Sequence, residues 1–382
     1  MAIRHSTVLV AFVAVGLLLG RPAGAQSVDT PATHALMIDA ATGAVLFEKN
    51  ADDPMPPASM SKLMTLLMVF ERLEDGSIGL EDTMRVSEAA WRMGGSRMFV
   101  EHNSRVPVED LLRGVIIQSG NDASVVFAEG LSGSEAAFAD EMNSRAAELG
   151  LTGSTFRNAT GWPDPEHRTT ARDLTKIAAR IINGFPEYYA IFQEKEFTYN
   201  NIKQGNRNPL LYKDIGADGL KTGHTEESGY GLVASAERKG RRLILVFNGM
   251  ESVNERSREG ERLLDMGFRD FNNYPLFMAN AVVEDAQVWL GAEATVPLVI
   301  EDDVLLTLSR KSRRDMTVTV SYESPVSAPI AKGAQLAELR IEGPNMEPVV
   351  RALVAGVAVD RLGFVGRLGA AISHIVWGTQ SP

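Results

Sequence analysis

Hydrophobic positions near the start of the chain change from the period of a strand to that of a helix. Residues 35–39 and 44–48 alternate around Ala41-Thr42-Gly43, which predicts a β-hairpin. Residues 63–70 are almost wholly apolar, a pattern typical of a helix that is buried on all sides. Pro56 and Pro57 precede that run and suit the first turn of a helix, where a missing N–H costs nothing.

Further helices are predicted downstream, where apolar residues recur every three or four positions. Ser134 is placed as the N-cap of one of them, and Gly150 lies just past its end. The predicted helices are Val108–Gln118, Glu135–Leu149 and Arg172–Ile182.

The period then changes back to that of strands. Three strand-like segments separated by short polar loops predict an antiparallel meander, at 219–225, 230–236 and 242–249. An amphipathic helix over 253–268 closes this region. Because strands lie at both ends of a helical middle, we expect one α+β domain over 26–275, in which the first hairpin joins the meander.

The last hundred residues follow a different pattern. Strand signals alone continue from Ala281, which predicts a smaller all-β domain over 281–350. Residues 361–382 have apolar positions on one helical face, two arginines and no acidic residue. About sixteen residues make only ~24 Å of helix, too short to span hydrocarbon comfortably. This amphipathic tail is expected either to associate with a membrane surface or to dock on its own β domain.

Residues 1–25 resemble a secretory signal: Arg4 and His5 precede an apolar core, and Ala23-Gly24-Ala25 offers a cleavage site. The chain contains no cysteine, which excludes disulfides and a thiol nucleophile. Its formal net charge of −11 argues against nucleic acid as a partner. With 45% hydrophobic and 23% charged residues the composition is that of a globular protein. A bacterial periplasm fits these features best.

Ser59 and Lys62 are the first candidates for chemistry. They lie three positions apart at the predicted start of the apolar helix, so the hydroxyl and the amine share one face. A lysine at the mouth of a buried helix is partly desolvated, which lowers its pKa towards a value suited to a general base. Alone, however, the spacing is weak evidence, because it recurs by chance in chains of this length.

Two more motifs follow in order. Ser119-Gly120-Asn121 ends the apolar helix at 108–118 and is expected to project from a turn, and Lys221-Thr222-Gly223 lies on a predicted strand. Ser-x-x-Lys, Ser-x-Asn and Lys-Thr-Gly together are the motif set of penicillin-binding proteins and serine β-lactamases.

The wider context is more specific. The stretches around the three motifs, 57–62, 118–123 and 218–225, closely resemble the low-molecular-mass penicillin-binding proteins that are serine D-alanyl-D-alanine carboxypeptidases. The resemblance runs from about residue 30 to about 270 and more loosely through the β domain. It implies the serine β-lactamase/DD-peptidase (transpeptidase-like) fold, an antiparallel sheet flanked by helices.

The resemblance also implies roles for single residues. Ser59 would be the nucleophile and Lys62 its base, with Ser119 passing a proton to the leaving amine. Asn121 would hold the substrate amide, and Lys221 would supply positive charge. The backbone N–H groups of Ser59 and His224 would form the oxyanion hole.

Recognition of a free C-terminal carboxylate calls for a hydroxyl and a cation beyond the scissile bond. In the resemblance, Thr222 of the Lys-Thr-Gly motif, next to Gly223, supplies the hydroxyl and Arg207 the cation. A solvated loop arginine remains the alternative for Arg207. Asp173 matches a carboxylate thought to assist deacylation; capping of a helix is its alternative.

The implied function is removal of the terminal D-Ala from peptidoglycan pentapeptides in the periplasm, at the outer face of the inner membrane, with β-lactams as inhibitors. The resemblance implies no cofactor and no metal, and the six histidines are scattered without His-Glu-x-x-His. A class A β-lactamase and a noncatalytic cell-wall binding protein remain as alternatives. A β-lactamase would carry a loop Glu four residues before an Asn, whereas Glu166 here precedes Thr170.

Overall fold

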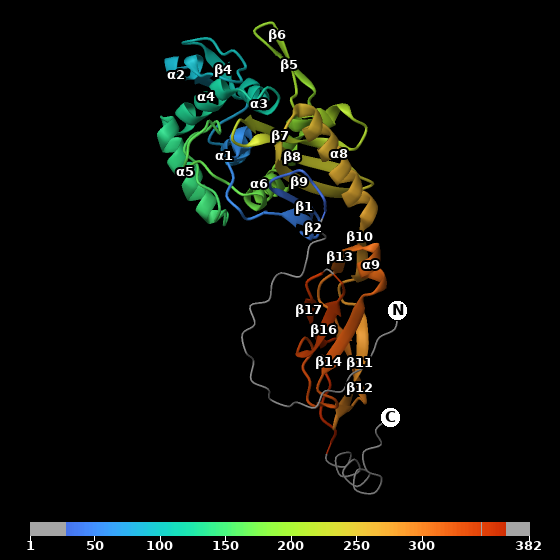
Figure 1. The fold of residues 1–382 in the computed structure, drawn as a ribbon. Helices are drawn as coiled ribbons and strands as arrows, with labels where there is room; N and C mark the ends of the chain where they lie inside the picture. The colour runs from blue at the N-terminus through green and yellow to red at the C-terminus, as the bar shows by residue number, and fades with distance from the viewer. Residues whose placement is uncertain (1–27, 345, 364–382) are drawn as a thin grey trace. The chain divides into compact units, whose positions relative to one another are not determined.

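The structure is a computed structural model, and it describes residues 28–344 and 346–363. The expected signal over 1–25, and residues 364–382 of the expected tail, lie outside the described residues. The described chain divides into two compact units, the first ending at Asp270 and the second beginning at Phe271 (Figure 1). Each unit is described by itself below.

The first unit is built on a five-stranded antiparallel sheet with the order β2-β1-β9-β8-β7. The N-terminal hairpin joins the later meander through the pairing of β1 with β9, which places Ala35 opposite Phe247 and confirms the α+β prediction. The sheet strands are β1 (Ala35–Asp39), β2 (Val45–Lys49), β7 (Ala217–Thr225), β8 (Gly229–Arg238) and β9 (Arg241–Met250).

Helices cover both faces of this sheet, with α8 on one face and α6 on the other (Figure 1). The alternation along β9 explains this: Ile244 and Val246 join the core around α1 and α6, whereas Leu243 packs against Gly267 of α8. The helices are α1 (Lys62–Glu74), α2 (Glu88–Arg92), α3 (Val108–Ile116), α4 (Asn121–Ser132), α5 (Glu135–Glu148), α6 (Ala171–Gly184), α7 (Pro186–Tyr189) and α8 (Val253–Asp270).

Helix α1 is the centre of the core, as its apolar sequence predicted. Every residue from Lys62 to Phe70 is buried. The Phe70 ring stacks on Tyr188 at a centroid distance of 5.3 Å and meets Phe192 edge-on at 6.4 Å. Because α1 is enclosed on all sides, the turn that precedes it is held in a fixed position.

Several short elements were not predicted from the sequence. Helix α4 begins at Asn121, where we expected only a turn, and ends at Gly133, whose φ of 79° terminates it. Short elements of this kind carry too few periodic positions to be recognised. The others in this unit are α2, α7, η1 (Ala58–Ser61), η2 (Ala190–Gln193), η3 (Pro209–Tyr212), β3 (Thr83–Arg85), β4 (Arg105–Pro107), β5 (Glu196–Tyr199) and β6 (Ile202–Gly205).

The second unit contains a six-stranded sheet with the order β14-β16-β17-β12-β11-β15 and a separate antiparallel pair of strands, β10 and β13. Its own core includes Val296, Leu298, Leu339 and Leu353. The strands are β10 (Phe271–Phe277), β11 (Val282–Trp289), β12 (Thr295–Val299), β13 (Val304–Ser309), β14 (Thr317–Tyr322), β15 (Val326–Ser327), β16 (Gln335–Glu342) and β17 (Val349–Ala355).

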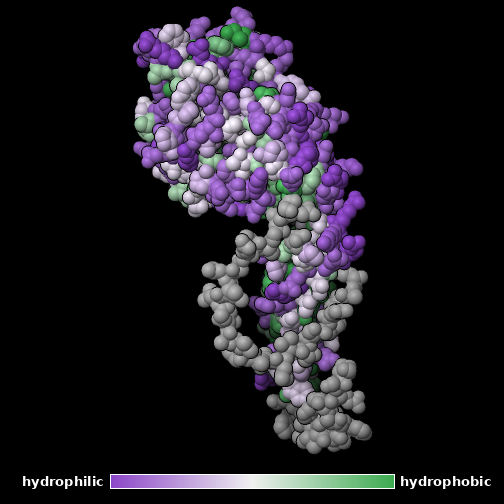
Figure 2. All heavy atoms as spheres, viewed as in Figure 1, coloured by the Kyte–Doolittle hydropathy of each residue, from purple (hydrophilic) through white to green (hydrophobic). Residues whose placement is uncertain are grey.

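A strand-only pattern was expected here, but a one-turn helix, α9 (Arg310–Arg314), interrupts it. The Ser309 hydroxyl caps α9 by accepting from the N–H of Ser312. Within the described residues, no helix has the length and apolar character needed to cross a membrane. On the face drawn in Figure 2, the surface of the first unit is mostly hydrophilic.

Candidate active site

Ser59 lies in the tight turn η1, immediately before α1. Pro57 is the residue before the turn, and Ala58 has a φ of +47°, a strained value for a residue with a side chain. In this geometry residues three apart stand above one another. Accordingly, the Lys62 amine donates a hydrogen bond to Ser59 Oγ at 2.9 Å. The structure therefore brings the predicted nucleophile and base into contact.

Lys62 is completely buried, and its amine has three acceptors. Besides Ser59 Oγ, it donates to Asn121 Oδ1 at 2.7 Å and to the carbonyl of Thr160. Burial, with a smaller contribution from the positive charge of Arg207, lowers the pKa of Lys62 to about 7. An amine with this pKa can gain or lose a proton near neutral pH. The neutral amine can accept a proton from Ser59, to which it is hydrogen-bonded.

The Ser119 side chain lies buried in the same region. Ser119 has a φ of +65°, and its Oγ has no hydrogen-bond partner among the described residues. A strained residue with an unsatisfied buried hydroxyl indicates a functional constraint. The hydroxyl is free to bond a substrate group.

Asn121 is held from two sides at the start of α4. Its side-chain Nδ2 donates to the carbonyl of Gly94 at 2.8 Å, and its backbone N–H donates to Ser96 at 2.7 Å. The side-chain amide is therefore oriented with Oδ1 towards Lys62. Together these contacts position the second motif against the first.

Asp122 is a positioning residue that the sequence pattern did not single out. Its buried carboxylate accepts from the backbone N–H groups of Met98, Phe99, Val100 and Ala123 at 2.9 to 3.3 Å. A carboxylate with this many backbone donors fixes the loop over residues 94–100 against the start of α4. The only signal of its role in the sequence is its position directly after the Ser-x-Asn motif.

Strand β7 carries the third motif and lies directly against η1. A Cβ on Gly223 would come within 3.0 Å of the Pro57 carbonyl, so only glycine permits this approach. Lys221 is buried, and desolvation, followed by the positive charge of Lys62, lowers its pKa well below the usual value. The effect of the Lys62 charge on the pKa of Lys221 places the two lysines in one electrostatic environment.

Thr222 and His224 lie on the same strand, and Arg207 lies near its beginning. Thr222 is buried, whereas His224 is exposed and stacks on Tyr230 at a ring-centroid distance of 3.8 Å. Asn208, the residue after Arg207, donates to the carbonyl of Gly219 at 2.8 Å. The charge of Arg207 lowers the pKa of Lys62 and Lys221, so Arg207 adds to the positive potential of the site.

A loop over residues 158–167, also missed from the sequence, packs against the Ser59 turn. Asn158 Oδ1 accepts from the N–H groups of Thr160, Gly161 and Trp162, which aims the Thr160 carbonyl at Lys62. A Cβ on Gly161 would lie 1.9 Å from the Ala58 carbonyl, so the loop touches the residue before the nucleophile. Glycine with a φ of +74° is required there.

His167 contacts the same turn through the side chain of Ser61. Its Nδ1 accepts from the N–H of Arg157 at 3.3 Å, which leaves the proton on Nε2 to donate to Ser61 Oγ at 2.8 Å. Burial lowers the pKa of His167 to about 4, so the ring is neutral at physiological pH. A single histidine in a Pro-rich loop carried no recognisable signal.

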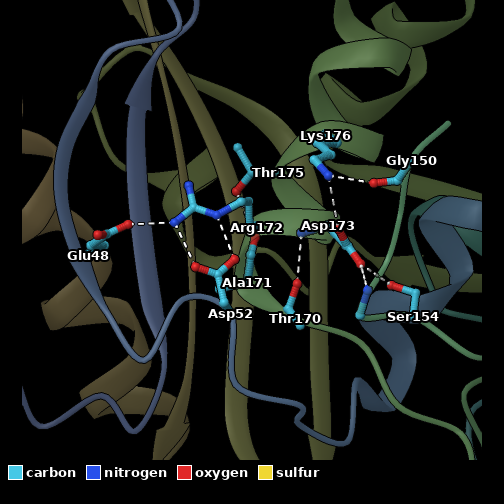
Figure 3. A network of polar contacts seen from close by, with 11 residues as sticks. Glu48, Asp52, Gly150, Ser154, Thr170, Ala171, Arg172, Asp173, Thr175 and Lys176 are labelled. Atoms are coloured by element: carbon cyan, nitrogen blue, oxygen red, sulfur yellow. Dashed lines mark hydrogen bonds and ion pairs between the residues drawn. The ribbon is translucent and has the colours of Figure 1, made fainter. Parts of the chain in front are cut away.

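Asp173 lies in a separate network at the start of α6 (Figure 3). Its carboxylate accepts from the Gly153 N–H and the Ser154 hydroxyl, and it pairs with Lys176 at 3.3 Å. Thr170, not Asp173, caps the helix, by accepting from the Asp173 N–H. No hydrogen bond joins this carboxylate to Ser59, Lys62 or Ser119 within the described part of the chain. No cluster of three His, Asp or Glu that could hold a metal ion occurs in that part either.

Comparison with known proteins bears on this geometry. Residues 22–252 match the sequence profile of the D-alanyl-D-alanine carboxypeptidases, and residues 271–361 match that of the penicillin-binding protein 5 C-terminal domain. The chain belongs to the D-alanyl-D-alanine carboxypeptidase family. Members of this family are serine peptidases, and the predicted family, fold class and enzyme class are thereby confirmed.

Individual relatives cover most of both chains. The D-alanyl-D-alanine carboxypeptidase DacC of Escherichia coli is 37% identical over 91% of this chain and 89% of its own. The crystal structure of penicillin binding protein 5 from Haemophilus influenzae has a TM-score of 0.76 and 34% identity, covering 88% of this chain and all of that one. Penicillin-binding protein D2 from Listeria monocytogenes, in its ampicillin-bound form, has a TM-score of 0.59 and 30% identity, covering 64% and 99%.

The pKa of Lys62 predicts the pH dependence of acylation in this family member. In its predicted role as the base, Lys62 has to be neutral to accept the Ser59 proton, and its lowered pKa of about 7 makes it mostly neutral above that pH. We therefore expect the rate of Ser59 acylation by a β-lactam to fall about tenfold per pH unit below the pKa and to level off above it. Stopped-flow acylation from about pH 5 to about pH 9 measures this profile. A rate independent of pH below 7, in protein that stays folded, would contradict it.

Proposed function

We propose that Ser59 attacks the carbonyl of the penultimate D-Ala of peptidoglycan pentapeptides and releases the terminal D-Ala, leaving tetrapeptides. The observation that carries this proposal is the 2.9 Å hydrogen bond between Ser59 Oγ and an amine whose pKa is about 7. Such a pair lets a serine act as a nucleophile at neutral pH. The family match supports this reaction over a β-lactamase or a noncatalytic binding protein.

In the first step Lys62 takes the Ser59 proton as the hydroxyl adds to the carbonyl. The new ammonium is stabilised where it forms, because Asn121 Oδ1 and the Thr160 carbonyl already accept from it. The backbone N–H groups of Ser59 and His224 are assigned to the oxyanion. Ser119, whose hydroxyl has no other partner in the described chain, passes a proton to the leaving D-Ala amine.

Water then hydrolyses the acyl-enzyme, with the proton steps reversed. Asp173 contributes to this step as a positioning residue. Its carboxylate holds Gly153 and Ser154 at the base of the loop that carries Thr160. Asp173 therefore affects deacylation indirectly, by positioning the Thr160 carbonyl that accepts a hydrogen bond from Lys62.

Arg207 and Thr222 bind the free carboxylate of the terminal D-Ala. The Arg207 side chain has no hydrogen bond or ion pair among the described residues, so it is available for a ligand anion. The buried Thr222 hydroxyl belongs to the strand that lies against Ser59. A carboxylate bound here places the preceding peptide bond at the nucleophile.

β-Lactams acylate the same serine in this proposal, since they carry a strained amide and a carboxylate at similar positions. The ampicillin-bound relative supports this assignment. We also propose a periplasmic location at the outer face of the inner membrane. The predicted signal over 1–25 and the basic amphipathic sequence of 361–382 support that location.

The nucleophile is tested with diacetyl-Lys-D-Ala-D-Ala. We expect Ser59→Ala to reduce release of free D-Ala by about 10³-fold or more, because no other group can form the acyl-enzyme. Ser77→Ala, an exposed serine beyond α1, is the matched control and should release D-Ala at the wild-type rate. Equal release from wild type and Ser59→Ala would refute the mechanism.

The carboxylate site is tested with the same peptide and its C-terminal amide. Loss of a charge-assisted hydrogen bond should lower kcat/KM of Arg207→Ala by about 10- to 100-fold on the free acid. The amide, which lacks the anion, should be affected far less. Arg85→Ala, an exposed arginine on β3, is the control. An equal fall in kcat/KM on both peptides would contradict the assignment of Arg207 to the carboxylate.

The tail is tested by ending the chain after Gly363. Arg361 donates to the Ala328 carbonyl and Leu362 N–H to that of Leu290, so this truncation leaves the β unit's contacts in place. We expect the truncated protein to move from the membrane pellet to the soluble fraction on cell fractionation. The full-length Ser59→Ala variant should stay in the pellet. Complete retention of the truncated protein there would defeat the membrane role.

A further inference from the structure

Trp162 is a large apolar side chain that is exposed beside the buried Lys62, Ser119 and Lys221. It follows Thr160 and Gly161 in the loop that packs on the Ser59 turn. Thr160 binds Lys62, and Gly161 touches Ala58. Trp162 is nevertheless 46% exposed. Exposed aromatic surface beside a reaction centre indicates a contact with ligand.

The backbone of Trp162 is rigidly held. Its N–H donates to Asn158 Oδ1 at 3.0 Å, and its carbonyl accepts from Asn158 Nδ2 at 3.1 Å. The same Asn158 aims the Thr160 carbonyl at Lys62. The backbone that carries the exposed indole therefore has a fixed position relative to the reacting groups and does not belong to a loosely held surface loop.

The indole packs against the loop that holds Asn121. A Cβ on Gly95 would lie 3.1 Å from the indole ring and 2.8 Å from Asn121 Nδ2. The ring and the Asn121 amide therefore flank the same glycine. Since Asn121 is assigned to the substrate amide, the ring borders the part of the cleft that this amide occupies.

The direction of the substrate follows from β7. Arg207, which binds the terminal carboxylate, is next to Asn208, and Asn208 is bonded to Gly219 near the start of that strand. Trp162 instead lines a crevice together with Ala58 and Thr225, and Thr225 is the end of the strand. A peptide with its carboxylate at Arg207 and its carbonyl at Ser59 thus extends its acyl part towards Trp162.

We propose that Trp162 determines specificity for the residue that precedes D-alanyl-D-alanine, by packing its indole on the long aliphatic side chain of a diamino acid. This inference rests on the proposed function. Methylene groups that end in a polar tip suit an aromatic surface at a wet rim, where the stem is covered and the tip stays in water. An ammonium tip adds attraction to the face of the ring.

The test compares diacetyl-Lys-D-Ala-D-Ala with acetyl-Gly-D-Ala-D-Ala, which keeps the backbone but lacks the side chain. We expect Trp162→Ala to lower kcat/KM about tenfold on the lysine peptide and less than about twofold on the glycine peptide. Trp162→Phe should restore most of the loss. Trp91→Ala is the matched control, because Trp91 is 43% exposed on α2 and should affect neither peptide.

Two outcomes would overturn the proposal. An equal fall on both peptides would mean that Trp162 only supports the loop, and no fall on the lysine peptide would mean that it makes no contact. These results differ from a failure of the proposed function, in which the wild-type protein itself would release no D-Ala from either peptide.

Discussion

The burial of the Lys62 amine is the constraint on which the active site depends. Burying a charged ammonium away from water costs free energy, and this lowers the pKa of Lys62. Hydrogen-bond acceptors around the amine stabilise its charged form. Opposing effects act on this pKa: desolvation and the charge of Arg207 favour the neutral amine, and the negative charges of Asp122 and Glu135 favour the ammonium. A pKa of about 7 is the balance, and it leaves both protonation states accessible during turnover.

Most other features around the site fix those acceptors. Asp122 holds the loop that holds Asn121, and Asn158 holds the turn that presents the Thr160 carbonyl. Glycines at 161 and 223 let two separate segments reach the Ser59 turn at contact distance. The strained φ angles of Ala58 and Ser119 persist because these neighbours determine the backbone on both sides.

The sequence predicted the sheet, the central helix and the three motifs because each rests on a local pattern. The apolar run 63–70 and the short apolar segment within 242–249 required no knowledge of distant contacts. Helix α4 was missed, since its start coincides with a motif that suggests a turn. Three residues were missed because their contacts leave no motif in the sequence. Asn158 holds a backbone turn, Thr160 acts through its carbonyl, and His167 forms a buried hydrogen bond with Ser61. The motif position of Asp173 did not reveal that its partners lie in the 153–154 segment, because that contact joins residues distant in sequence.

The small hairpin β5–β6 connects two parts of the active site. The Gln204 side chain donates to the Met98 carbonyl and the Asn200 side chain to that of Phe99, within the loop fixed by Asp122. The chain that leaves this hairpin reaches Arg207 two residues after Gly205. Arg207, which is proposed to bind the end of the peptide, and Asn121 are thus connected through one hairpin, so we expect a substitution at its tip to alter affinity and rate together.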